Sequence, residues 1–119
     1  MSGPVRCSVD VAELVERVGG ERELLREVVA IFLEECPGRM ERLNDAIRVR
    51  DLVALELAAH SLEGCLSMFA AAEGVRLTKA IARSAESGDY TDVATQYAAL
   101  GDEVGRIKLE LLNLASDSR

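Results

Sequence analysis

Hydrophobic residues recur every three or four positions along almost the whole chain, the spacing that places them on one face of an α-helix. The pattern predicts a short first helix over about residues 10–18, with Asp10 and Glu13 at capping-box spacing and Gly19-Gly20 after its end. No stretch alternates with the period of two that is typical of a half-buried strand. We therefore expect an all-α fold.

The next segment begins at Glu21, and its apolar positions recur from Leu25 to Ile47 across Pro37. Proline inside a helix removes one backbone donor and clashes with the preceding turn. This segment is therefore predicted to be either one long helix kinked near Cys36-Pro37 or two helices that abut there. Asp51 is suited to cap the next helix. The predicted inward positions of that helix are Leu52, Leu55, Ala59, Leu62, Leu66 and Phe69.

Two further amphipathic segments complete the chain. One covers residues 73–87 and stops at "SGD", and the other carries an apolar stripe from Val93 to Leu114. The pattern predicts an antiparallel up-down-up-down four-helix bundle with a short N-terminal capping helix. We expect one domain over residues 1–119, with its bundle core at about 10–115. The last stripe could serve a coiled-coil dimer, but bundle core is the commoner use, so a monomer is expected.

Composition narrows the possible partners. A chain of 119 residues, 49% of them hydrophobic, fits a single packed core. Its net charge of −7 argues against binding nucleic acid or an anionic membrane, and favours a protein partner. Neither a signal peptide nor an apolar run of about 20 residues is present, so a cytoplasmic location is expected. Three scattered cysteines and one histidine form no metal-ligand pattern, so we expect reduced thiols and no metal or cofactor.

His60, the one histidine, is the main candidate for chemistry. At about 100° per residue it lies roughly 130° from the centre of the apolar stripe, so it is predicted to face water. Glu56, Gly64, Ser67 and Ala71 are predicted on the same side, and the last three are small. A neutral imidazole on such an open surface is an accessible nucleophile. A merely solvated surface histidine is the alternative, and geometry alone favours it.

The stretch "AAHSLEGCLSMFAA" resembles the phosphoacceptor motif of histidine-containing phosphotransfer (HPt) domains, A-H-x-L-K-G followed by a small G-A element. "LVERVGGERELLREVVAIFLEECPGRM" and "ARSAESGDY" are similar to the family's flanking segments, so the resemblance covers about residues 10–114. It implies a phosphorelay carrier without kinase or hydrolase activity of its own. Its partners would be a receiver domain, which supplies Mg²⁺, and a hybrid histidine kinase, of which the chain could itself be a piece.

The resemblance implies roles for individual residues and shows two departures. His60 would be the phosphoacceptor, Leu62 a core anchor, and Gly64 the small residue that leaves room for phosphate and receiver. Glu63 stands where the family usually has lysine, and Ala70 where a glycine is usual, which we expect to be the milder change. A carboxylate beside a phosphoryl group of about two negative charges reverses the sign of the interaction. Alternatively, Glu63 is a solvated residue paired with a base.

Basic residues on the following helix could compensate for the negative charge of Glu63. Arg76, Lys79 and Arg83 recur at helical spacing, and antiparallel pairing would bring Arg83 level with Glu63. Helical geometry points this stripe mostly away from the bundle, so a solvated face is favoured. Two functions remain: a phosphocarrier that uses His60, which we favour, and an HPt-like binding module that docks a receiver or kinase without carrying phosphate.

Overall fold

The computed structural model describes residues 7–116, and within that range it contains five α-helices and no strand. The all-α prediction is therefore confirmed for this part of the chain. None of the helices there is long and apolar enough to cross a membrane. The helices are α1 (Val11–Arg17), α2 (Arg22–Val49), α3 (Leu52–Met68), α4 (Ala72–Glu86) and α5 (Val93–Ser116).

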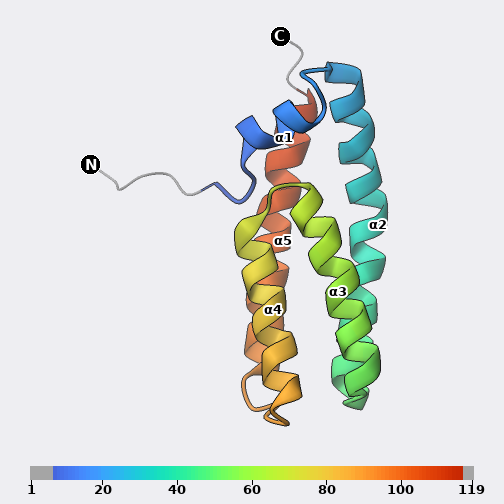
Figure 1. The fold of residues 1–119 in the computed structure, drawn as a ribbon, viewed down its shortest axis with the longest axis vertical. Helices are drawn as coiled ribbons and strands as arrows, with labels where there is room; N and C mark the ends of the chain where they lie inside the picture. Colours follow the sequence, from blue (N-terminus) through green and yellow to red (C-terminus); the bar gives the residue numbers. More distant parts are fainter. Residues whose placement is uncertain (1–6, 117–119) are drawn as a thin grey trace, which may run out of the picture.

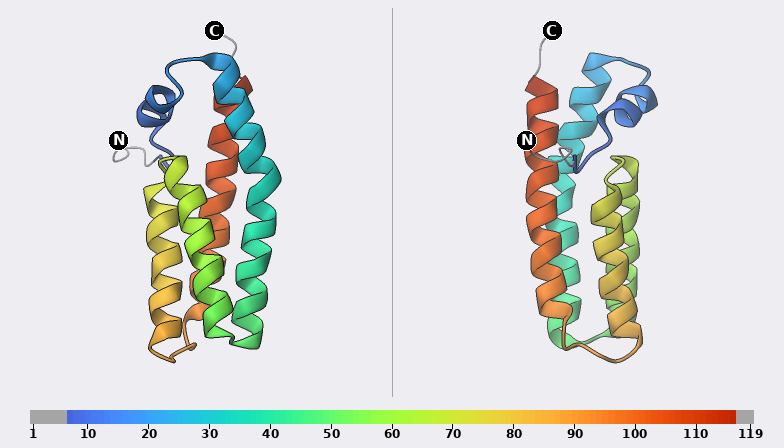
Figure 2. Two further views of the ribbon diagram at one scale, coloured as in Figure 1. Left: turned by 45° about the vertical axis from the view of Figure 1, so that its right-hand side comes forward. Right: turned by 90° about the vertical axis from the view of Figure 1, so that its left-hand side faces the viewer.

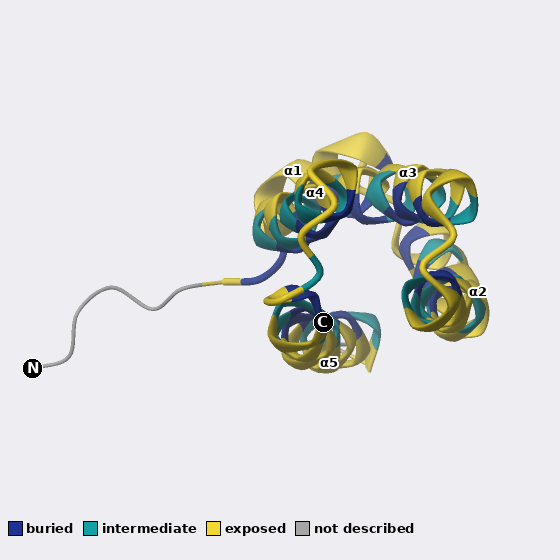
Figure 3. Ribbon diagram, turned by 90° about the horizontal axis from the view of Figure 1, so that it is seen from below, coloured by how far each residue is buried: buried dark blue, intermediate teal, exposed yellow. Residues whose placement is uncertain are grey.

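The four long helices lie side by side and alternate in direction. Figure 1 shows the chain descending along α2, returning along α3, descending along α4 and returning along α5. Each packs against the next, and α2 closes the ring against α5. The short helix α1 lies across the end where α3 meets α4 (Figure 2). Seen from below, buried residues face the shared interior and exposed residues face outward (Figure 3).

Helix α2 runs through Pro37 without interruption, so the alternative of two abutting helices is wrong. Pro37 itself is exposed, while Phe32 and Cys36 just before it are buried. Because a proline removes only one helical hydrogen bond, the core contacts on both sides can hold the helix together. After α2 ends, the Asp51 carboxylate accepts a hydrogen bond from the Ala54 amide at 3.2 Å, which confirms the predicted cap of α3.

The core follows the predicted apolar stripe of α3 with one exception. Leu52 is 37% exposed, because it is the first residue of α3 and lies at the end of the bundle that α1 does not cover (Figure 1). The largest fully buried side chains come from all four long helices: Phe32, Leu43, Leu55, Leu62, Leu66, Ile81, Leu100, Ile107 and Leu111. Their burial supplies the main stabilising free energy of the fold.

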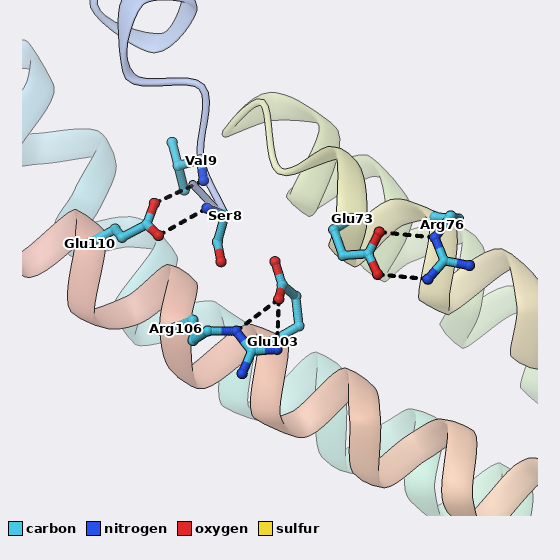
Figure 4. Close-up of polar contacts among 7 residues, drawn as sticks. All are labelled: Ser8, Val9, Glu73, Arg76, Glu103, Arg106 and Glu110. Atoms are coloured by element: carbon cyan, nitrogen blue, oxygen red, sulfur yellow. Dashed lines mark hydrogen bonds and ion pairs between the residues drawn. The ribbon is translucent and has the colours of Figure 1, made fainter. Parts of the chain in front are cut away.

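Polar contacts attach the N-terminal segment and α1 to the bundle. The Ser8 and Val9 amides donate to the Glu110 carboxylate at 2.8 and 2.9 Å (Figure 4). The Arg17 guanidinium donates to the Ser67 and Met68 carbonyls at 2.7 and 3.0 Å. These carbonyls are at the C-terminal end of α3, where a cation is favourable and acceptors lack helical partners. Helix α1 therefore holds the end of the helix that carries His60.

Candidate functional site

His60 lies near the middle of α3 on the outer face of the bundle, as the helical pattern predicts. Its neighbours Ala59 and Leu62 are buried, and they anchor this stretch of helix in the core. Gly64, one turn further on, is exposed, and a Cβ atom placed there would meet nothing within 4 Å. The imidazole therefore stands beside free space that a partner protein could enter.

A groove of 410 Å³ runs along the seam between α2 and α3 and includes His60 in its wall. The lining residues of α3 are His60, Ser61, Gly64, Cys65 and Met68, followed by Phe69 just after the helix, and those of α2 are Val28, Ile31, Phe32, Glu35 and Arg39. Most of this lining is apolar, with Glu35 and Arg39 as its charged residues. The groove thus combines an accessible imidazole, a guanidinium and an apolar floor.

Arg39 is the residue of this site that sequence reasoning missed. Its guanidinium donates to the Ser61 hydroxyl and, at 2.9 Å, to the Glu35 carboxylate one helical turn away. The Arg39 Nε is buried and has no hydrogen-bond partner among residues 7–116. Counting outward from the turn at residues 50–51 would have placed Arg39 level with Ser61, because α2 and α3 are antiparallel.

Glu63 and Glu56 lie on the other side of His60. At about 100° per residue, Ser61 is turned about 100° from His60 toward α2, whereas Glu63 is turned about 60° in the opposite direction. Glu63 is half-buried and does not line the groove. Glu56 shares a hydrogen bond with Glu86 of α4, which raises the pKa of Glu56. The predicted acidic neighbours of His60 therefore face α4 and not the groove.

The small residues predicted around His60 are only partly brought together. Ser67 is exposed, about 10 Å further along the α3 axis. The placement of Ala71 on the same open surface is wrong, because α3 ends at Met68 and Ala71 is fully buried at the start of α4. Gly64 is thus the small residue that keeps space free beside the imidazole.

The predicted basic stripe of α4 faces outward. Lys79 and Arg83 are exposed, and neither forms an ion pair with Glu63 in the described part of the chain. Arg76 is paired with Glu73 on its own helix at 2.6 Å (Figure 4). A compensating role for Lys79 or Arg83 stays a prediction.

The cysteines near the groove are poor nucleophiles. Burial raises the pKa of the Cys36 thiol to about 11, and burial also raises the pKa of Cys65. Both thiols are therefore protonated near neutral pH, and the thiolate is the reactive form. Among residues 7–116, no three His, Cys, Asp or Glu side chains are grouped to hold a metal ion. His60 is left as the best-placed nucleophile of the site.

The fold and this site define a class: a small helical bundle that presents one accessible histidine beside a groove on its surface. The family model for the Hpt domain matches residues 27–116. The crystal structure of histidine-containing phosphotransfer protein B (HptB) from Pseudomonas aeruginosa PAO1 superimposes with a TM-score of 0.84. That match has 19% sequence identity and covers 99% of this chain and 100% of the other, so it shows a shared fold. No curated protein matches the sequence.

The chain belongs to the Hpt domain family, because the family model covers most of its length. Hpt domains are phosphocarriers of two-component phosphorelays rather than enzymes, and they interact with receiver domains and kinases. Family membership thus supports histidine phosphotransfer in a phosphorelay as the general activity.

Proposed function

We propose that His60 accepts a phosphoryl group from the aspartyl phosphate of a receiver domain and passes it to a second receiver. An imidazole nitrogen lone pair forms the new P–N bond while the P–O bond to the aspartate breaks, and the carboxylate leaves with that electron pair. The reverse step returns the phosphoryl group to another aspartate. We expect Mg²⁺ to be held by the receiver, while this chain supplies the nucleophile and its surroundings.

The accessibility of His60 is the observation that carries this proposal. In-line attack requires the donor phosphate to approach the imidazole from outside, with the attacking and leaving atoms aligned. His60 is exposed, and Gly64 leaves the space one turn away unfilled. A receiver could thus bring its phosphorylated aspartate up to the imidazole without displacing a side chain at position 64.

The surface beside His60 is also suited to a protein partner. Ile31 of α2 and Met68 of α3 line the groove and are 54% and 64% exposed. Large apolar side chains that stay exposed next to a functional group are typical of docking surfaces. The apolar face of α5 is by contrast used internally, since Leu100, Ile107 and Leu111 are fully buried. We therefore propose that the chain acts as a monomer and docks receivers over α2 and α3.

Glu63 favours a second candidate function, a binding module that docks a receiver or kinase without carrying phosphate. Its carboxylate is one helical turn from His60 and would repel a phosphoryl group. Because Glu63 is half-buried and one turn is shorter than the screening length of about 8 Å at physiological ionic strength, salt weakens this repulsion only in part. We favour the carrier because Glu63 lies on the side of His60 away from the groove.

Transfer from a radiolabelled phospho-receiver separates the two functions. The carrier should gain an acid-labile, alkali-stable label that His60→Gln abolishes, while the helicity and melting temperature of this variant stay unchanged. Glu63→Lys should raise the labelled fraction at equilibrium, most strongly at low salt. If the wild type binds the receiver but stays unlabelled while Glu63→Lys is labelled, the chain is a binding module. Equal labelling of His60→Gln would refute both the site and the mechanism.

A further inference from the structure

Arg39 of α2 is placed to act on a phosphoryl group carried by His60. We propose that Arg39 binds and stabilises that group, and that it supplies from α2 the positive charge that Glu63 does not supply from α3. Arg39 and His60 line the same groove, and the Arg39 guanidinium already contacts Ser61, the residue next to His60. The biological meaning of this role rests on the proposed function.

The reach of Arg39 follows from the packing of the two helices. Because they are antiparallel about the turn at residues 50–51, Arg39 lies nearly level with Ser61 and within about 3 Å of the height of His60 along the axis. The bond from Arg39 to the Ser61 hydroxyl crosses the seam between α2 and α3. From this position, a rotamer change of a long side chain is enough to turn the guanidinium toward the imidazole.

The chemistry of arginine suits this role. A guanidinium has five donors in a planar fork, which matches two oxygens of a phosphoryl group. In the unphosphorylated protein, one Nη atom donates to Ser61 and the other donates to Glu35, while the buried Nε lacks a partner within residues 7–116. A phosphoryl group of about two negative charges would compete with the single charge of Glu35 for the same cation. Phosphorylation is therefore expected to draw Arg39 away from Glu35.

The bases of α4 are less well placed for the same task. Ser61 and Gly64 continue the surface of His60 toward α2, and both line the groove with Arg39. Lys79 and Arg83 belong to α4, across the side of α3 on which Glu63 lies, and they do not line this groove. The structure thus favours a cation from α2 over one from α4.

Chemical phosphorylation tests the proposal without a receiver. Phosphoramidate transfers its phosphoryl group to histidine: its P–N bond breaks, a P–N bond to the imidazole forms, and ammonia leaves with the electron pair. Because His60 is the one histidine, a single ³¹P NMR signal then reports this site. Arg39→Gln should raise the pH midpoint at which this ³¹P signal titrates by about half a unit, a roughly threefold change in proton binding by the phosphohistidine. Arg39→Lys should restore most of the shift, and Glu35→Gln should move the midpoint downward.

Two control variants make the result specific. Arg48→Gln removes an exposed arginine of the same helix about 13 Å further along the axis, and it should leave the midpoint unchanged. Arg83→Gln tests the α4 stripe and should also have no effect. Equal midpoints for wild type and Arg39→Gln would overturn the inference, as would a shift in Arg83→Gln alone or an unlabelled wild type. A failure of receiver transfer together with the expected midpoints would instead reject only the proposed function.

Discussion

The charges around His60 are divided between its two sides. Arg39 lies on the α2 side, where it contacts Ser61 and Glu35. Glu63 lies on the α4 side. A phosphoryl group on His60 would therefore be attracted toward the groove and repelled from the opposite side. The charge of a single residue in the motif does not determine the electrostatics of the site, because a charged residue of another helix lines the groove with His60.

Ala70 gives a residue-scale prediction about stability. It follows α3 with φ of +53°, a left-handed conformation that costs an L-residue roughly 1 kcal/mol or more, whereas glycine adopts it readily. The Ala70 carbonyl also accepts a hydrogen bond from the Asp10 amide at 3.0 Å, so its backbone is fixed in place. Ala70→Gly should raise the free energy of unfolding by about 1 kcal/mol, measured by urea denaturation.

The matched control for Ala70→Gly is Ala72→Gly in the first turn of α4, where φ is not positive. That substitution should destabilise the protein by a few tenths to about 1 kcal/mol, since glycine gains nothing there. A destabilised Ala70→Gly would show that the left-handed conformation carries no strain. The replacement of glycine by alanine at position 70 thus has a structural cost that the sequence alone does not reveal.

At the scale of the helix, Leu62 and Leu52 test how α3 is anchored. Leu62 is fully buried beneath His60, whereas Leu52 at the start of the same helix is 37% exposed. Leu62→Ala should lower the free energy of unfolding by about 2 to 5 kcal/mol, because it removes a core side chain and leaves a cavity. Leu52→Ala should cost less than about 1 kcal/mol. Chemical denaturation of both variants measures the difference, and equal losses would contradict the assignment of the buried face.

The helices could be predicted from the sequence because their signals are local. Apolar spacing, the Asp51 cap and the Gly19-Gly20 stop each depend on a few neighbouring residues. Two predictions were wrong because they depended on where α3 begins and ends. Leu52, predicted to be buried, lies in the first turn of α3, and Ala71, predicted beside His60, lies beyond the last turn of that helix. Arg39 could not be assigned to the site from periodicity, since its contact with Ser61 spans 22 positions and depends on how α2 packs against α3.

At the scale of the whole molecule, two cysteine thiols and a tyrosine hydroxyl in the packed interior predict how stability depends on pH. Burial raises the pKa of the Cys36 thiol from its ordinary value of 9.0 to about 11. Burial also raises the pKa values of Cys65 and Tyr97, and the Tyr97 hydroxyl donates to the Met40 carbonyl at 3.0 Å. Cys36, Cys65 and Tyr97 belong to α2, α3 and α5, which share one core. Each stays protonated in the folded protein at a pH where the unfolded chain would release its proton.

The contribution of these groups to the free energy of unfolding should therefore be constant below about pH 8. It should fall as the pH rises from about 9 to 11. The sign follows from proton binding: in this window the folded state holds more protons than the unfolded state, so alkali favours unfolding. For Cys36 alone, the difference between 9.0 and about 11 corresponds to at most about 2.7 kcal/mol.

Urea denaturation at a series of pH values from 7 to 11 measures this dependence. Cys36→Ala should lower stability at pH 7, because it removes a buried side chain, but it should also flatten the alkaline decline, leaving the part due to Cys65 and Tyr97. Cys7→Ala is the matched control, since Cys7 is an exposed free thiol and its removal should leave the profile unchanged. Parallel declines for wild type and Cys36→Ala would show that the buried thiol does not link folding to pH. A flatter decline in Cys36→Ala would show that burial of this thiol in the core links its proton release to unfolding.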